Sequence, residues 1–179
     1  MQILWYPAAG VFRGDWKGLL PGWAEPPNSL ALFFQDTGVD LITFGPEAEQ
    51  AKDEARERFI AEALKVSRRL QRRGYRSTVF DPIDGLPVRV RDNDVDPPRF
   101  WSTQNWSDIR AARLVSGFAV EAVGGCHVVV HPQYGRRVYI GSLVCSALYI
   151  ELIDLVGQKS SYASGLAYAS QIQAVSAGS

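Results

Sequence analysis

The sequence has few of the residues that most often carry chemistry. Among 179 residues there are two cysteines, two histidines and one methionine. Two cysteines cannot build a disulfide framework, and a chain long enough to bury a sizeable core does not need one. A single bridge would need Cα atoms within about 7 Å of each other, a register that the sequence does not fix. We therefore expect Cys126 and Cys145 to be free thiols.

Net charge and long hydrophobic runs are missing too. The 19 basic and 19 acidic residues cancel, so the chain has no general electrostatic attraction for nucleic acid or anionic membranes. No run approaches the roughly 18 apolar residues that span a bilayer. The start, MQILWYPAAGVF, lacks the positive charge that precedes the apolar part of a signal peptide. We expect an ordinary globular protein in the cytoplasm.

The clearest predicted element is a long helix over 47–73. Apolar residues recur there every three or four positions, and Gly74 is a suitable residue just beyond its end. Acidic residues crowd its start and arginines its end, as the helix dipole favours. The five arginines between 68 and 76 are therefore interpreted as a solvated face that complements the dipole, rather than as a nucleic-acid site.

Shorter elements are predicted around this helix. A second helix begins after Ser107, a suitable N-cap, and includes Gly117, which weakens its middle. Segments 126–131 and 137–144 are predicted to pair as a β-hairpin. Other strands are expected over 29–35, 40–44, 75–80, 86–90 and 148–156, with a short helix as the alternative for the last.

These elements predict the fold class and the domain organisation. Strands separated by two helices, with at least one antiparallel hairpin, indicate an α+β sandwich. We expect a single domain over 1–158. Segment 159–179, rich in Ser, Ala and Gly, is expected to be a flexible tail or a partner-binding arm.

Two patterns resemble metal sites, and neither is favoured. Segment 92–96, DNDVD, has alternating carboxylates, but a calcium loop needs glycine and glutamate where this chain has Pro97 and Thr103. His127 and His131 have the HxxxH spacing of helical zinc sites, but on a strand they lie about 13 Å apart. We expect a solvated loop, and two histidines that act singly if they act at all.

Cys126 has two interpretations. On a strand it shares a face with Val128 and Val130, which is typical of a small core residue. Gly124 and Gly125 favour a ligand role instead, because they keep side chains away from the thiol and allow another molecule to approach closely. A thiolate is a soft donor, suited to a metal such as cobalt rather than to calcium or magnesium.

A resemblance to a known family is carried by RRGYRSTVFDPIDGLP at 72–87 and SGFAVEAVGGCHVVVHPQYGRRVYIGSLVCSA at 116–147. These stretches resemble the C-terminal domain of the CblD family, the cobalamin trafficking proteins of methylmalonic aciduria and homocystinuria type D. The shared pattern is a helix ending in GY, FDPxxGL, GFxV before a glycine turn, CxVxxH and GxxVxxGS. It spans about 30–150 with few gaps.

The same region is similar to the cobalamin domain of epoxyqueuosine reductases and reductive dehalogenases. Their AARxxGLGxxG, PxYGxR and VxLGxV motifs correspond to AARLVSGF, HPQYGRR and VYIGSLV. Those enzymes also carry CxxCxxCxxxCP cluster ligands, which two cysteines cannot supply, so reduction through an on-board iron–sulfur relay is excluded. Both relatives imply a nitroreductase-like sandwich, an antiparallel sheet with flanking helices.

The CblD resemblance implies a non-catalytic adapter without a redox cofactor, which pairs with a CblC-like cobalamin processing protein. Better-known members have two adjacent cysteines in the glycine turn. Here Gly125 takes the first position and Cys126 the second. We expect the Cys126 thiolate to bind the cobalt of cobalamin, while Gly124 and Gly125 leave room for the corrin edge.

Three further residues at the predicted bend, His131, Tyr134 and Arg136, are expected to contact corrin amides or the phosphate. Other functions stay open at this point. The chain is alternatively a small flavin nitroreductase-like or cobalamin-reducing enzyme, or a structural subunit in which Cys126 is buried. Because nitroreductase-like folds often pair, a homodimer also stays open.

Overall fold

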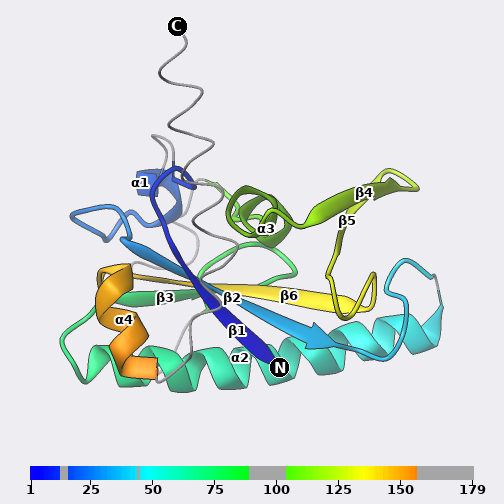
Figure 1. Ribbon diagram of the computed structural model, residues 1–179, viewed down its shortest axis with the longest axis horizontal. Coiled ribbons are helices and arrows are strands. Elements are labelled where there is room, and N and C mark those ends of the chain that lie inside the picture. Colours follow the sequence, from blue (N-terminus) through cyan, green and yellow to red (C-terminus); the bar gives the residue numbers. More distant parts are fainter. Residues whose placement is uncertain (13–15, 44, 89–103, 157–179) are drawn as a thin grey trace, which may run out of the picture.

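The chain folds around a four-stranded antiparallel sheet of order β1-β2-β6-β3, with a separate two-stranded sheet, β4-β5 (Figure 1). The computed structural model describes residues 1–12, 16–43, 45–88 and 104–156. The strands are β1 (Gln2–Pro7), β2 (Ser29–Asp36), β3 (Ser77–Phe80), β4 (Ala119–Val123), β5 (Cys126–Val130) and β6 (Val138–Cys145). The helices are α1 (Trp16–Leu19), α2 (Pro46–Gln71), α3 (Asp108–Ser116) and α4 (Tyr149–Val156). This architecture confirms the predicted α+β class.

Helices cover both faces of the four-stranded sheet. Its two central strands, β2 and β6, are almost wholly buried, as expected for strands packed on both sides. On one face Phe33 packs edge-on against Phe59 of α2, with ring centroids 5.2 Å apart. On the other face Leu30, Leu32 and Phe34 pack in the cluster that also contains the buried residues of α3.

Helix α2 confirms the strongest sequence prediction. Its buried residues recur at helical spacing along one side: Ala48, Ala55, Phe59, Ala63, Ser67 and Leu70. Full burial of a side chain as large as Phe59 stabilises the fold by roughly 1.5–3 kcal/mol. Arg56 adds a polar anchor, because its guanidinium binds both carboxylate oxygens of Asp81, which follows β3.

The predicted pairing of 126–131 with 137–144 is wrong. Strand β6 pairs with β2 and β3 instead, and its run of buried side chains is typical of a central strand whose sheet is covered on both faces. Strand β5 pairs with β4 through Gly124 and Gly125, whose φ angles are 55° and 84°. Two glycines with positive φ form the two-residue turn that suits a tight hairpin.

Helix α4 corrects a second prediction, since 148–156 was expected to be a strand. The carboxylate of Glu151 accepts a hydrogen bond from the backbone N–H of Leu148 at 2.8 Å. This contact satisfies a donor that the first helical turn leaves free, so it stabilises the helix start locally. The periodicity of a short apolar segment does not reveal such a cap.

Two smaller predictions also fail. Residues 40–43 form a turn rather than a strand, because the Asp40 carboxylate accepts from the backbone of Ile42 at 3.2 Å. Gly117 was expected inside the second helix, whereas with φ of 69° it ends α3. The Ser107 cap is confirmed, since its hydroxyl accepts from the Arg110 N–H at 3.2 Å.

Some predictions fall outside the described residues. These include the acidic segment 92–96, the end of the expected strand over 86–90, and segment 159–179. Within the described part of the chain, none of the helices combines the length and the hydrophobicity that crossing a membrane requires.

Candidate functional site

The β4-β5 hairpin projects from the body of the molecule (Figure 1). Its register pairs Ala119 with Val130 at the base and Val123 with Cys126 at the tip. Two-stranded hairpins are marginal on their own in water. This one is supported at its base, where Val129 is buried in the same core cluster as α3. The tip beyond that support is exposed on both strands.

Cys126 lies at this tip as the first residue of β5. Its thiol is free and exposed. A Cβ atom built on Gly124 or Gly125 would meet nothing within 4 Å, so the space beside the turn is open. The interpretation of Cys126 as a buried core residue is therefore wrong. An accessible sulfur beside an open turn is what the ligand interpretation requires.

The second sulfur has the opposite environment. Cys145 is buried at the end of β6, and its Sγ accepts a hydrogen bond from the Ala147 N–H at 3.3 Å. Burial raises the pKa of this thiol to about 11, so it stays protonated at neutral pH. Both cysteines are free, as expected. Of the two thiols, only that of Cys126 is accessible to a ligand from solution.

His131 lies just beyond β5 and is buried. Its Nδ1 accepts from the backbone N–H groups of Gln133 at 3.2 Å and Tyr134 at 3.4 Å. Its ring stacks on Tyr134 and meets Phe118 edge-on, with centroids 4.5 Å and 5.0 Å away. Desolvation lowers its pKa, which keeps the imidazole neutral. His131 therefore braces the turn that follows β5, and its contact with a corrin stays a prediction.

The other predicted contacts also have structural partners. Tyr134 is half-buried through its stacking on His131. Arg136 forms ion pairs with Asp40 at 2.9 Å and with Glu121 of β4 at 3.8 Å. It thus connects the hairpin to the loop that follows β2. Sequence reasoning missed these acidic partners, because they lie far from Arg136 along the chain.

The two histidines do not meet. His127 is exposed beside Cys126 at the tip, whereas His131 is buried near the hairpin base. Among the described residues no three His, Cys, Asp or Glu side chains are grouped closely enough to hold a metal ion.

A buried carboxyl fixes the helix on which the hairpin rests. Asp108, at the start of α3, accepts hydrogen bonds from Trp106 Nε1 at 3.0 Å and from the Ser142 hydroxyl of β6. Burial raises the pKa of Asp108 to about 7, opposed by these two hydrogen bonds and assisted by the charge of Asp81. Sequence reasoning missed this residue, because an acid just after a Ser N-cap is ordinary in any helix.

The sequence of this chain matches that of a known protein family. Residues 10–152, which include the whole hairpin, match the family model described as methylmalonic aciduria and homocystinuria type D protein. The chain belongs to this family. Two curated type D relatives, from rat and human, are named cobalamin trafficking protein CblD, and each is 28% identical over 137 residues.

The matches to these type D relatives cover 76% of this chain and 43% of theirs. A chicken relative of the same name is 25% identical over the same share of each chain. This chain thus spans less than half the length of the curated proteins that it matches. The match confirms the resemblance that the GGC turn and the FDPxxGL segment indicated.

Proposed function

We propose that this chain is a cobalamin-trafficking module, in which the Cys126 thiolate is the ligand for cobalt. The observation that carries the proposal is the position of Cys126, a free and exposed thiol at the tip of a projecting hairpin. The names of its relatives support cobalamin as the cargo. A thiolate is among the softer protein ligands and suits cobalt.

The hairpin suits delivery of that sulfur into a cavity of another molecule. Its tip carries no side chain on Gly124 or Gly125, so the backbone itself can approach a flat ring. Its base is fixed by Val129 in the core and by the ion pairs of Arg136. The hairpin therefore presents the thiolate at a slim tip while its base is held in place by the rest of the protein. Less conformational entropy is then lost when the thiolate binds.

The chain would act as an adapter rather than as an enzyme. A CblC-like processing protein is the proposed partner. Cys126 would hold the cobalt of cobalamin through its thiolate, and this chain would supply no electrons. We also propose that the sandwich is of the nitroreductase-like form and that the protein is cytoplasmic. It would pair either with the processing protein or with a second copy of itself.

The decisive test is a titration of the full chain with hydroxocobalamin, followed by the corrin absorption spectrum. The wild type should shift the spectrum, and Cys126→Ser should not. The adjacent exposed residue provides a matched control, since His127→Ala should keep the shift.

Two results would reject the cobalt-ligand proposal. One is the absence of any spectral shift in the wild type. The other is an equal shift in the wild type and in Cys126→Ser, which would assign the change to a different group. A yellow flavin spectrum of the purified protein would instead favour the nitroreductase-like enzyme.

A further inference from the structure

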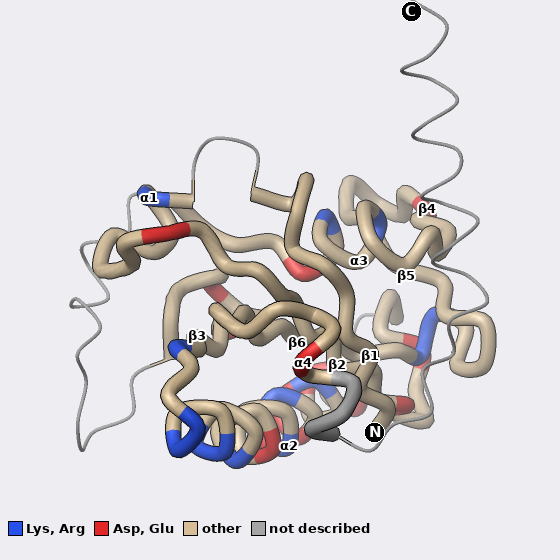
Figure 2. The backbone as a smooth tube through the Cα atoms, turned by 60° about the vertical axis from the view of Figure 1, so that its left-hand side comes forward, with Lys and Arg blue, Asp and Glu red and all other residues tan. Residues whose placement is uncertain are grey.

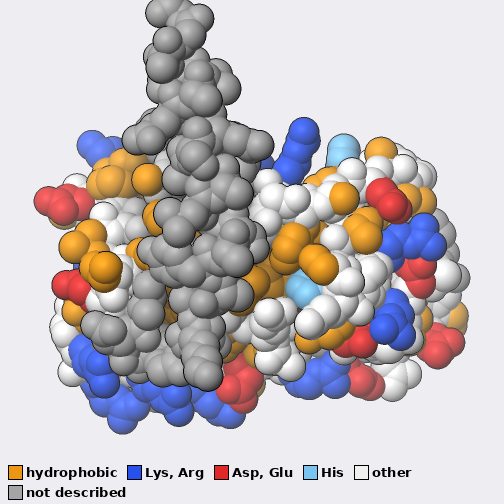
Figure 3. Space-filling view, in the orientation of Figure 1, with side chains coloured by type: hydrophobic (Ala, Val, Ile, Leu, Met, Phe, Trp, Pro, Cys, Tyr) orange, Lys and Arg blue, Asp and Glu red, His pale blue; other side chains and the backbone are white. Residues whose placement is uncertain are grey.

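Helix α2 carries charges of both signs over most of its length but only basic ones near its end. Six acidic residues lie within 47–62, together with Lys52, Arg56 and Arg58, whereas between 63 and 80 the sequence has five arginines, one lysine and no acid. Figure 2 shows the basic residues gathered at the end of α2 that leads to β3. Figure 3 shows the same charge as a patch along one border of the molecule. We call it the basic patch: Lys65, Arg68, Arg69, Arg72 and Arg73.

Most of this patch has no acidic partner. Lys65 pairs with Glu62 at 2.5 Å. The four arginines are exposed, and their side chains form no ion pair or hydrogen bond with any residue that the structure describes. By contrast, Arg56, Arg58, Arg136 and Arg137 each have an acid within 4.0 Å.

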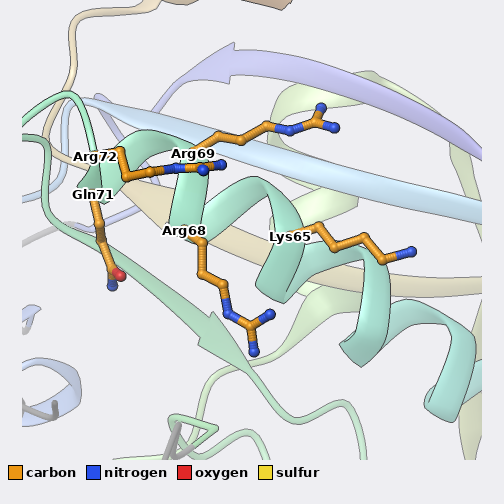
Figure 4. A pocket seen from close by; sticks show the side chains of 5 residues that line it. All are labelled: Lys65, Arg68, Arg69, Gln71 and Arg72. Atoms are coloured by element: carbon orange, nitrogen blue, oxygen red, sulfur yellow. The ribbon is translucent and has the colours of Figure 1, made fainter. Parts of the chain in front are cut away.

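The basic patch also extends further along α2 than the helix dipole can explain. Cations in the last turn interact favourably with the negative end of the dipole, and this effect fades within one turn. Here the cations extend over 65–73, and neighbours three or four positions apart repel one another. Figure 4 shows Arg69 and Arg72 pointing the same way, at one side of the helix, while Arg68 points elsewhere. An anion between such side chains would relieve their repulsion.

The side chains border an open hollow. It has a volume of about 670 Å³, and its described lining consists of four basic residues and Gln71. Because guanidinium groups present paired N–H donors that match carboxylates, arginines suit acidic side chains better than a single ammonium does.

We propose that the basic patch is a docking surface for an acidic segment of a partner protein. Nucleic acid is a weaker candidate, because the chain as a whole is neutral and offers no wider basic field. The surface is separate from the Cys126 site. Helix α2 has 26 residues and is thus about 39 Å long, and the hairpin lies toward the end where it begins (Figure 1). The proposal does not depend on cobalamin binding.

The test measures binding of a fluorescein-labelled oligoglutamate peptide to the full chain by fluorescence anisotropy. Arg69→Glu/Arg72→Glu should weaken binding about tenfold or more, since each reversal replaces an attraction by a repulsion. Arg110→Glu/Arg113→Glu is the matched control. It makes the same change in net charge at the same spacing on α3, across the sheet, and should leave binding within about twofold.

Three further arms sharpen the test. Arg69→Lys/Arg72→Lys keeps the charge but removes the paired donors, so it should bind the peptide more weakly than the wild type. Raising the salt concentration should weaken binding. A single-stranded oligonucleotide in the same buffer should bind less tightly than the peptide.

The proposal is overturned by any of three results. They are the absence of saturable peptide binding, equal losses in the α2 and α3 double variants, and tighter binding of the oligonucleotide than of the peptide. Circular dichroism of each variant establishes that it is folded. The hydroxocobalamin titration should be unchanged in Arg69→Glu/Arg72→Glu, so the result is independent of the Cys126 proposal.

Discussion

The Asp108 carboxylate accepts a hydrogen bond from the Ser142 hydroxyl, and this contact joins the start of α3 to the centre of the main sheet. Because α3 packs against the hairpin, the position of the Cys126 tip depends on a partly buried acid. The following predictions test this dependence and the local structure that supports the tip.

Asp108 should make stability fall as pH rises. Its pKa is about 7 in the folded protein and about 4 when unfolded, so the folded state holds the proton more tightly. The free energy of unfolding should decrease from about pH 4 to about pH 7 and then level off, by on the order of 4 kcal/mol. Chemical denaturation of wild type and Asp108→Asn checks this, and the Asn variant should lose that slope. Glu57→Gln, an exposed change on α2, should keep it. A slope that persists in Asp108→Asn would contradict the assignment.

His131 should act in the opposite direction. Desolvation lowers its pKa in the folded protein, so the stability that it contributes is complete above about pH 6.5 and is lost as pH falls below that value. His131→Phe keeps an aromatic ring but removes the acceptor of two backbone N–H groups. It should cost about 1–3 kcal/mol at pH 7.5 and remove the loss on the acid side. The comparison is His127→Phe at the exposed tip, which should do neither.

The turn that precedes Cys126 should require its glycines. Gly124 has φ of 55°, so Gly124→Ala should destabilise the hairpin by roughly 1–2 kcal/mol without any steric clash. Gly124→Asn should cost less, because asparagine tolerates the left-handed region. Hydrogen exchange of the Val128 and Val130 amides reports local opening directly. Equal protection in all three proteins would show that the turn does not limit hairpin stability.

Gly141 should be the least replaceable glycine of the main sheet. A Cβ atom there would lie 2.5 Å from the ring of Phe59, so Gly141→Ala should destabilise the fold by about 1–3 kcal/mol through overpacking. Phe59→Leu alone should also destabilise it, by removing ring contacts. The loss of stability measured for the double variant should be smaller than the sum of the two single losses, because the smaller side chain at 59 makes room for the methyl group at 141. Strict additivity in a thermal denaturation series would refute the proposed contact.

Much of the fold could be predicted from the sequence, because its signals were local. The apolar spacing of 47–73 and the Ser107 cap identified α2 and the start of α3. Strand pairing could not be predicted equally well. The choice between β4 and β6 as the partner of β5 depends on which strand is buried on both faces, a property of the assembled sheet. The Gly124-Gly125 pair was a usable signal for the true hairpin and was interpreted only as space for a ligand.

In the candidate site, too, the residue with a local signal could be predicted and its distant partners could not. Cys126 was identified from its residue type and its glycine neighbours, and its exposure agrees with that prediction. The supporting residues were not identified. Asp40 and Glu121 meet Arg136 only after three separate segments have folded together, and the Asp108 contact with Ser142 joins residues 34 positions apart. Such partners carry no pattern in the linear sequence.

The turn between β4 and β5 determines both the position of the Cys126 sulfur at the hairpin tip and the direction in which it points. With Val123 opposite Cys126 and two residues between them, the direction of the thiol is set by the strand pleat. One inserted residue that shifted the pairing of β5 would send the sulfur to the reverse side of the ribbon. A member of the family with a longer loop would therefore need a cysteine at a different place to reach the same target.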